Sequence, residues 1–491
     1  MNLKIKKYIS LHIALLFIII LVAVFFRFYN TPNRYGFDYD PTRDALIVDY
    51  AAKTLQFPLI GPPSGIGPFT FGPWYYYQLI LFKIVFPVDY APWIYIGIAS
   101  TISVFIMYRI GMLLEGKTLG LLLAALTALS PAETGQIRAL SNPTLIPLHA
   151  TLAIWIFIKF VKEKPSLWMA FLWGLILGIG INNHYQMLGL LPLPIIIFIY
   201  KKDRRWIRIL TFVAGISIAF VPLFVFNFLH GWSTVKGLIF YISQGASNIY
   251  IPNRWLYYVR DFWPIFLSYV LGLSSKLGIF IGLYMGFVIS YLLLKRKLSI
   301  AYIFLIITFT INFLAFRSFP GQREYYYLLY LHPFIFILFS LVILHMFSFK
   351  LGKYLGFIIL MTVLIGMTLQ SVERLKTRED QMQFKNEAQA IINNYSNKKF
   401  VIYECVNSQK NRVRGVVFFL NINNKLSEDG IKIAYPNEKC PLPVSDKLSA
   451  RHLHDVNAID ISYASDELLL KYGWKMVTPK TVFTQLSQGT F

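Results

Sequence analysis

The chain has 491 residues, of which 56% are hydrophobic, 17% aromatic and only 14% charged. Soluble domains average about 25% charged residues, so the composition excludes a water-soluble globule or a string of such domains. The formal net charge of +23 comes from 47 Lys and Arg against 24 Asp and Glu. These basic residues separate apolar runs instead of gathering on one soluble face. The pattern indicates a membrane protein with a positive-inside bias and argues against nucleic acid as a partner.

Apolar runs long enough to cross a bilayer recur along the first 370 residues. The first covers 8–26, and Lys4, Lys6 and Lys7 before it predict a cytoplasmic N-terminus. Further runs cover 91–113, 117–135, 144–162, 166–182, 185–200, 207–227, 277–294, 299–316, 327–348 and 352–369. The predicted fold class is a polytopic α-helical protein of the plasma membrane with about eleven spans. The odd count predicts an extracytoplasmic C-terminus. Residues 74–86 would be only about 20 Å long as a helix and are predicted to form a re-entrant or slanted helix; the alternative is a further span, which would change the total.

The composition changes near residue 372. Residues 372–396 are charged and helix-like. Short strands are predicted over 399–405, 415–422, 431–436 and 458–464. The sequence therefore predicts a small extracytoplasmic α/β domain over 372–491, after a membrane module over 1–371.

The chain has two cysteines, Cys405 and Cys440, and both fall in the predicted α/β domain. In an oxidising compartment two cysteines most simply form a disulfide. Two buried free thiols are the alternative.

Sequence motifs for nucleotide or zinc binding are absent. The sequence has no Walker loop, no GxGxxG after a strand, no HExxH and no CxxC, so ATP-driven transport and thiol-bound zinc lose support. No spacing of metal ligands is diagnostic. The sequence therefore establishes no cofactor and leaves a divalent metal ion open.

The first predicted outer loop, 27–73, is the acidic part of the membrane module. Residues 41–55 are predicted to form an amphipathic helix at the membrane surface, with Asp40 as its N-cap and Pro41 as its first residue. Asp40 is also a candidate general base. The two roles are compatible, because a cap uses one carboxylate oxygen and leaves the other free.

Three charged neighbours of Asp40 belong to the same candidate site. Arg43 lies three residues further on, where it could neutralise Asp40 or bind a phosphate. Asp44 could be a first-turn acid favoured by the helix dipole or, like Asp38, part of a substrate pocket.

Polar residues in three later outer loops are predicted to face the same cavity. They are Arg138 and Asn142, then Asn183, His184 and Tyr185, and finally Arg323, Glu324 and Tyr325. A lone histidine is more often structural than functional, and the aromatic stretch 228–276 could be no more than an interfacial belt. The guanidinium of Arg323 in an outer loop runs against the positive-inside trend and suits phosphate recognition. His184 is a second candidate for that contact.

Together these residues indicate a transferase. The acids could activate a hydroxyl, the cations could stabilise a phosphate leaving group, and the aromatic faces could stack on sugar rings. Nucleotide sugars are made in the cytoplasm, so an enzyme working outside needs a membrane-borne donor. The sequence predicts transfer of a sugar from a polyprenyl-phosphate carrier to an acceptor hydroxyl of a glycan, lipid or protein at the outer membrane face.

Four segments carry a resemblance to a known family. They are YDPTRDAL at 39–46, PLIGPPSGIGPFTFGPWYYYQLILF at 58–82, GIGINNHYQML at 178–188 and REYYYLLYLHPF at 323–334. Their order and predicted sidedness resemble the GT-C superfamily of integral-membrane glycosyltransferases over about residues 8–370. The nearest branch is that of the protein O-mannosyltransferase-like and aminoarabinose-transferase-like enzymes.

The resemblance implies that Asp40 is the catalytic base of an inverting transfer, with Arg43 at a basic position of the same motif. Two departures stand out. The family's Asp-Glu pair is Asp40-Pro41 here, and Asp38 or Asp44 could compensate. The family's Lys before the Pro of the second segment is Gly72 here, and Arg323 or His184 could replace its phosphate contact.

Two other classes of function compete with the transferase. A polyisoprenoid-linked transporter or flippase would also need basic residues and tyrosines facing a cavity. Its charges should follow the whole translocation path, whereas here they stop at the predicted outer face. A sensor or assembly scaffold would explain the α/β domain but not the polar loops.

Overall fold

The computed structural model describes residues 3–202, 204–244, 254–319, 323–395, 398–405, 410–435, 451–453, 456 and 458–489. Within these residues, eight helices are long and apolar enough to cross a membrane, and three shorter apolar helices (117–129, 167–183 and 185–200) lie among them. Each of the predicted spans corresponds to one of these helices. The polytopic α-helical fold is therefore confirmed.

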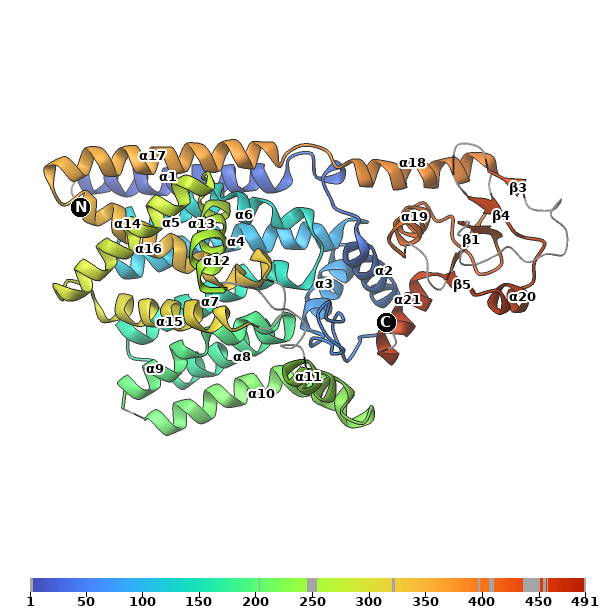
Figure 1. Cartoon of the computed structure of the whole chain (residues 1–491), viewed down its shortest axis with the longest axis horizontal. Helices are drawn as coiled ribbons and strands as arrows, with labels where there is room; N and C mark the ends of the chain where they lie inside the picture. The colour runs from blue at the N-terminus through green and yellow to red at the C-terminus, as the bar shows by residue number, and fades with distance from the viewer. Residues whose placement is uncertain are drawn as a thin grey trace.

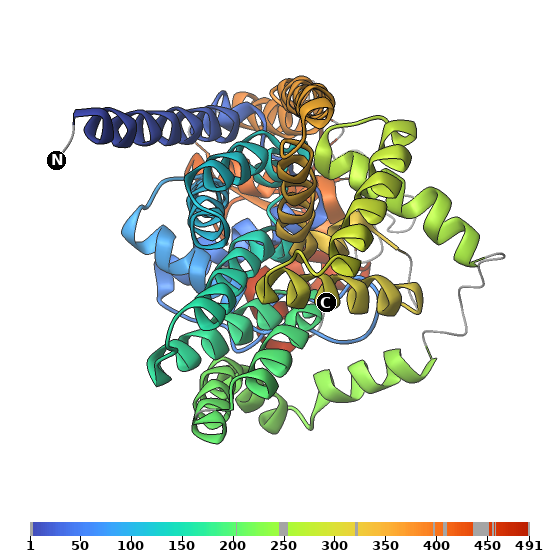
Figure 2. The same ribbon diagram turned by 90° about the vertical axis from the view of Figure 1, so that its left-hand side faces the viewer.

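The spanning helices run roughly along the long axis of the molecule (Figure 1). The long ones are α1 (Leu3–Phe28), α4 (Ala91–Leu114), α7 (Ile146–Lys162), α10 (Arg205–Leu229), α14 (Ser275–Leu294), α15 (Ile300–Arg317), α16 (His332–Met346) and α17 (Lys350–Glu373). The shorter ones are α5 (Lys117–Leu129), α8 (Leu167–Asn183) and α9 (Pro192–Tyr200). The span that contains α16 is 94% buried and forms the centre of the bundle, whereas α1 is 17% buried and reaches away from it (Figure 2).

Further short helices connect the spans, and the first two of them lie at the end of the bundle that faces the C-terminal unit (Figure 1). They are α2 (Tyr39–Thr54), α3 (Trp74–Val85), α6 (Pro131–Thr134), α11 (Ser233–Gln244), α12 (Arg254–Tyr257) and α13 (Trp263–Leu271). The helix predicted over 74–86 is α3, and its 12 residues make it about 18 Å long, too short to cross a bilayer.

A small α/β unit follows α17 and lies beyond the bundle (Figure 1). Its helices are α18 (Glu379–Asn394), α19 (Lys410–Ile422), α20 (Asp466–Lys471) and α21 (Pro479–Gln488). Its strands are β1 (Phe400–Cys405), β2 (Ile431–Ala434), β3 (Arg451–His452), β4 (Ile459–Asp460) and β5 (Trp474–Val477). They form one sheet in the order β3-β4-β2-β1-β5, in which β1 and β2 are parallel and the other pairs antiparallel.

One predicted strand is wrong. Residues 415–422 belong to α19, whose buried residues include Val413, Val416, Val417 and Leu420. That spacing of three and four follows the helical period, but a short apolar run gives strand and helix the same local signal. Strand β5 was not predicted, because only its first and last residues, Trp474 and Val477, are buried.

Cys405 ends β1, is 1% exposed and is disulfide-bonded. Its predicted partner, Cys440, lies outside the described residues. The disulfide thus fixes the end of a central strand of the sheet.

Helix α2 is held between the membrane bundle and the α/β unit. The sequence predicts an amphipathic surface helix, but residues 41–49 are all buried, because α3 packs on one side and α19 and α21 on the other. Just before α2, Phe37 is fully buried, with its ring centroid 5.2 Å from that of Trp93 and 5.0 Å from that of Phe419. Asn421 of α19 donates to Asp49 of α2 at 2.9 Å.

Phe37→Ala is expected to lower the free energy of unfolding by about 3 kcal/mol, because it leaves a cavity between the bundle and the α/β unit. The melting temperature of the detergent-solubilised protein measures this loss. The control is Phe57→Ala, since Phe57 is 40% exposed in the same predicted outer loop. Equal melting temperatures for the two variants would contradict the packing described.

Candidate active site

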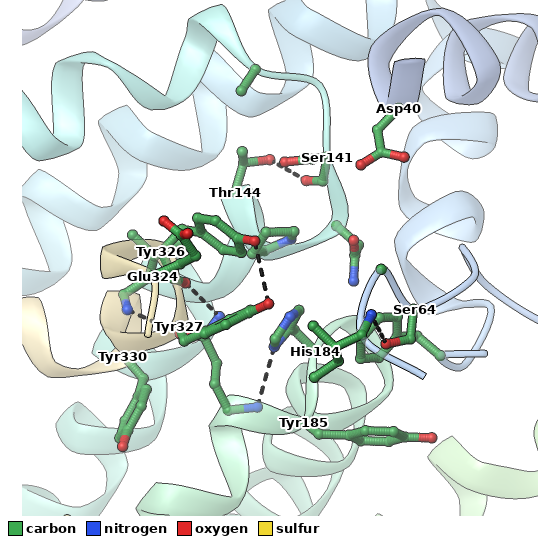
Figure 3. A pocket seen from close by; sticks show the side chains of 18 of the residues that line it. Asp40, Ser64, Ser141, Thr144, His184, Tyr185, Glu324, Tyr326, Tyr327 and Tyr330 are labelled. Atoms are coloured by element: carbon green, nitrogen blue, oxygen red, sulfur yellow. Dashed lines mark hydrogen bonds between the residues drawn. The ribbon is translucent and has the colours of Figure 1, made fainter. Parts of the chain in front are cut away.

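A cavity of about 760 Å³ opens at the end of the bundle that carries α2 (Figure 3). Its wall comes from segments that are distant in sequence: residues 63–71, 135–144, 184–186, 238–242, 316–319 and 324–330, together with Tyr269. Asp40 at the start of α2 completes it. All of these segments follow or precede spans at the same end of the bundle, so the topology brings the predicted outer loops together.

Asp40 lies in the first turn of α2 and points toward the cavity (Figure 3). Its side chain is 53% exposed. The predicted N-cap role is wrong: the helix begins at Tyr39, and the cap position is Asp38, whose side chain makes no capping hydrogen bond. Proline is tolerated throughout the first helical turn, where backbone N–H groups have no intrahelical partner, so Pro41 marks the start only to within a turn.

Arg43 holds Asp40 in place. Its Nη1 is 2.7 Å from Oδ1 of Asp40, and its Nε is 2.7 Å from Oδ1 of Asp44. Tyr76 of α3 donates to the same Asp44 oxygen at 2.7 Å. Arg43 and Asp44 are 1% and 0% exposed. The arrangement leaves Oδ2 of Asp40 without a hydrogen-bond partner among the described residues.

The same contacts keep Arg43 charged. Burial alone would lower the pKa of Arg43, but the neighbouring carboxylates and phenol raise it well above its usual value. Burial raises the pKa of the Asp44 carboxyl, and Arg43 opposes that shift. A buried charge must be paired, so these residues act as one unit.

Gly72 allows the loop before α3 to lie in close contact with the end of α8. Its N–H donates to the carbonyl of Asn182 at 2.9 Å, and a Cβ on Gly72 would lie 1.6 Å from Oδ1 of Asn182. Asn142 donates to the carbonyl of Asn183 at 2.6 Å, which fixes the next loop to the same place. No side chain fits at Gly72, which gives a physical reason for the departure from the family's lysine.

His184 forms part of the cavity wall. Its ring stacks on Phe71, with the centroids 4.7 Å apart, and Tyr327 lies 5.7 Å away. Burial lowers the pKa of His184 to about 3, so its imidazole is neutral at physiological pH. A neutral imidazole can donate one hydrogen bond to a substrate but contributes no positive charge.

The opposite wall is rich in tyrosine. Gln186 donates to the carbonyl of Tyr326 at 3.1 Å and accepts from the N–H of Leu329 at 2.9 Å, which fastens this segment to the end of α8. The hydroxyls of Tyr326 and Tyr327 are 3.3 Å apart. Glu324 lines the cavity beside them (Figure 3).

The structure divides the predicted site residues into two groups. Those that line the cavity are Asp40, Asn142, His184, Tyr185 and Glu324. Those that do not line it are Asp38, Arg43, Asp44, Arg138, Asn183, Arg323 and Tyr325.

In the second group, Arg43, Asp44 and Arg323 are buried, whereas Asp38 is 70% exposed. Arg323 is 8% exposed, donates to the carbonyl of Arg317 at 2.7 Å and lies 5.6 Å from the ring centroid of Tyr258. Tyr325 packs its ring on Phe262, with the centroids 5.4 Å apart. The phosphate role predicted for Arg43 and Arg323 therefore has no support from their position.

Several lining residues were not predicted from sequence. They include Ser141, Thr144, Tyr241 and Tyr269. Ser141 and Thr144 flank the predicted Asn142 and are linked by a 2.6 Å hydrogen bond from the Thr144 hydroxyl to the Ser141 carbonyl. Their place beside a polar Asn-Pro step was the available signal. Tyr241 and Tyr269 lie on helices in an aromatic stretch, where nothing in the sequence marks one tyrosine among many.

The charged lining of the cavity is acidic. Asp40 and Glu324 contribute carboxylates, and no lysine or arginine of the described residues lines it. Among the residues that the structure describes, no cluster of three or more His, Cys, Asp or Glu side chains is arranged to hold a metal ion.

This fold and site define a class of protein: a polytopic membrane protein whose loops build a carboxylate-bearing cavity at one end of the bundle. Residues 73–228 match the family model of the dolichyl-phosphate-mannose-protein mannosyltransferases. No curated protein sequence matches the chain.

Solved structures share the fold. ArnT from Cupriavidus metallidurans bound to undecaprenyl phosphate superposes with a TM-score of 0.58 at 11% identity, covering 94% of this chain and 99% of ArnT. The archaeal oligosaccharyltransferase AglB from Archaeoglobus fulgidus, in complex with an inhibitory peptide and a dolichol-phosphate, gives a TM-score of 0.51 at 12% identity. That match covers 80% of this chain and 59% of AglB. The chain therefore shares its fold with these two membrane proteins, and the family match over residues 73–228 supports the resemblance seen in its sequence.

Arg43→Ala is expected to lower the free energy of unfolding by about 3–5 kcal/mol, because it leaves Asp44 buried without its cation. The melting temperature of the purified protein measures the loss. Lys53→Ala in the same helix is the control: Lys53 pairs with Asp49 at 2.7 Å but is 59% exposed. Exposed pairs contribute about 1 kcal/mol or less. A larger loss for Lys53→Ala than for Arg43→Ala would contradict the buried unit.

Proposed function

We propose that this protein is an inverting glycosyltransferase. It moves a sugar from a polyprenyl-phosphate carrier to an acceptor hydroxyl at the outer face of the plasma membrane. The observation that carries the proposal is the geometry of Asp40: one carboxylate oxygen is fixed by Arg43 at 2.7 Å, and the other is open to the cavity. The family match and the polyprenyl phosphates in the ArnT and AglB structures support the donor class.

Asp40 acts as the general base. Its free oxygen accepts the proton of the acceptor hydroxyl, and the acceptor oxygen attacks the anomeric carbon of the donor sugar. The bond between that carbon and the phosphate oxygen breaks, and its electron pair leaves with the polyprenyl phosphate. A single displacement of this kind inverts the configuration at the anomeric carbon.

Glu324 supplies the second acid of the cavity. Asp38 and Asp44 were the candidates from sequence, but Asp38 is 70% exposed beside Arg378 and Asp44 is buried in its pair with Arg43. Glu324 and Asp40 both act electrostatically on Tyr326, so the two carboxylates face one region of the cavity. We assign Glu324 to a hydroxyl of the bound sugar, and His184 and Tyr185 to the same pocket.

The positive-inside rule supports the sidedness of this site. Basic clusters at Lys159–Lys164, Lys201–Arg208, Lys295–Lys297 and Lys350–Lys353 all lie at span ends remote from the cavity. The proposal therefore places the N-terminus in the cytoplasm and the cavity, with the α/β unit, outside.

Asp40→Asn is expected to reduce the rate of sugar transfer by about 10²–10⁴-fold while donor-lipid binding is retained, because the amide cannot accept the proton. The assay incubates the purified protein with a panel of polyprenyl-phosphate sugars and detects the glycosylated acceptor. Asp38→Asn is the matched control and is expected to keep its activity, since Asp38 does not line the cavity. Full transfer by Asp40→Asn would overturn Asp40 as the base, and carrier movement across vesicles without transfer would favour a flippase.

Gly65→Cys is expected to react with a membrane-impermeant maleimide in intact cells. Gly65 is exposed at the cavity, with open space around its Cα. Lys297→Cys, in the turn between α14 and α15, is expected to react only after the cells are permeabilised. The unsubstituted chain gives the background from its own cysteines. The reverse pattern of labelling would place the cavity in the cytoplasm.

A further inference from the structure

A phosphate leaving group in this cavity needs a cation that the lining residues do not supply. The charged lining residues are Asp40 and Glu324, and the imidazole of His184 is neutral. Two carboxylates repel a phosphate unless positive charge lies close by. An arginine at the rim of the cavity would supply that charge.

We propose that Arg374 is the phosphate-binding residue and that its ligand is the phosphate monoester of a polyprenyl lipid. This assignment rests on the proposed function for the identity of the donor. Arg374 follows α17 directly, where the last span ends and the link to the α/β unit begins. A lipid phosphate lies at this depth, at the border between the hydrocarbon core and water.

Arg374 reaches the wall of the cavity at two points. Its guanidinium carbon lies 5.6 Å from the ring centroid of Tyr269, and its Nη1 would be 2.9 Å from a Cβ on Gly135. Tyr269 and Gly135 both line the cavity. The missing side chain at Gly135 thus makes the space that the guanidinium occupies.

Hydrogen bonds from two neighbouring segments hold the backbone at Arg374. Ser371, one turn earlier, donates to the carbonyl of Leu129 at 2.8 Å and lies 2.9 Å from the hydroxyl of Thr134. The Nε of Arg34 donates to the carbonyl of Arg374 itself at 3.1 Å. These contacts join the end of α17 to the segment that carries Gly135. They give the guanidinium a defined position, which lowers the entropy lost on binding a ligand.

An arginine at the end of a span can also do no more than place its charge at the membrane surface. Other arginines of the chain form ion pairs: Arg378 is 3.6 Å from Asp38, and Arg260 is 3.0 Å from Asp261. Among the described residues, no carboxylate pairs with Arg374 and no hydrogen bond from its guanidinium is present. A positioned cation beside an acidic cavity is what an incoming phosphate requires, since a guanidinium binds phosphate oxygens through two N–H groups.

Binding of undecaprenyl phosphate to the full chain in nanodiscs tests the assignment. Arg374→Gln is expected to weaken binding by about tenfold to a hundredfold, the usual effect of losing hydrogen bonds between charged groups. Arg378→Gln removes the same charge four residues further along the chain and is expected to bind as the unsubstituted chain does. Equal affinity of Arg374→Gln and the unsubstituted chain overturns the proposal.

Gly135→Ala keeps the test decisive if Arg374→Gln fails to fold. The added methyl group takes the space beside Nη1 and is expected to weaken binding severalfold, while Gly286→Ala in α14, where an added Cβ meets nothing within 4 Å and which does not line the cavity, is expected to have no effect. Unchanged affinity of Gly135→Ala counts against the proposal.

Undecaprenol and inorganic phosphate identify the ligand. Undecaprenol, which lacks the phosphate, is expected to bind weakly and equally to the unsubstituted chain and Arg374→Gln. Inorganic phosphate is expected not to compete at millimolar concentration, and effective competition would mean a free-phosphate site and overturn the lipid assignment.

The assay also separates this inference from the proposed transferase. If lipid binding depends on Arg374 but no sugar is transferred, the proposed enzymatic activity is rejected and the phosphate site is retained. If transfer depends on Asp40 but Arg374→Gln binds the lipid normally, only the assignment of the phosphate site is rejected.

Discussion

The buried guanidinium of Arg43 is the interaction on which the site depends. It bonds two carboxylates, and Tyr76 ties one of them to α3, so the start of α2 has one arrangement relative to the bundle. Asp44 is buried and Asp40 is half exposed, so Asp40 is the carboxyl group of this unit that faces the cavity. Arg43 is thus a positioning residue, and the oxygen that it leaves free is the one that the cavity can reach.

The α/β unit completes this arrangement from the other side. Without it, the face of α2 that packs on α19 and α21 would lie in water, and Tyr50 would lose its contact with Phe483 of α21, whose ring centroid lies 5.0 Å from its own. Packing of Phe37 against Trp93 and Phe419 joins the unit, the loop before α2 and α4 in one aromatic cluster. A small unit with a sheet thereby becomes part of the support of a membrane site.

The spans could be predicted from sequence because a bilayer demands about twenty consecutive apolar residues, a signal that tertiary structure does not alter. The same reasoning fails where packing decides. The run 415–422 is helical because α19 has partners on α2 and α18, and α2 is buried because a distant unit covers it. Asp40 and Arg43 were predicted as neighbours from their spacing on a helix, yet only the fold shows that Arg43 faces inward. Arg374 carries no local signal, since Gly135 and Tyr269 meet it only in three dimensions.

The link between α17 and α18 contacts both the proposed phosphate site and the segment that carries the proposed base. At its first residue, Arg374 lies against Gly135 and Tyr269 in the cavity wall. At Arg378, the backbone N–H donates to Asn33 at 3.0 Å and the side chain faces Asp38, two residues before the proposed base. An inverting displacement needs the base and the leaving-group cation on different sides of the anomeric carbon. The link contacts the cavity wall through Arg374 and the loop before α2 through the backbone of Arg378, so the two proposed groups belong to one connected part of the structure.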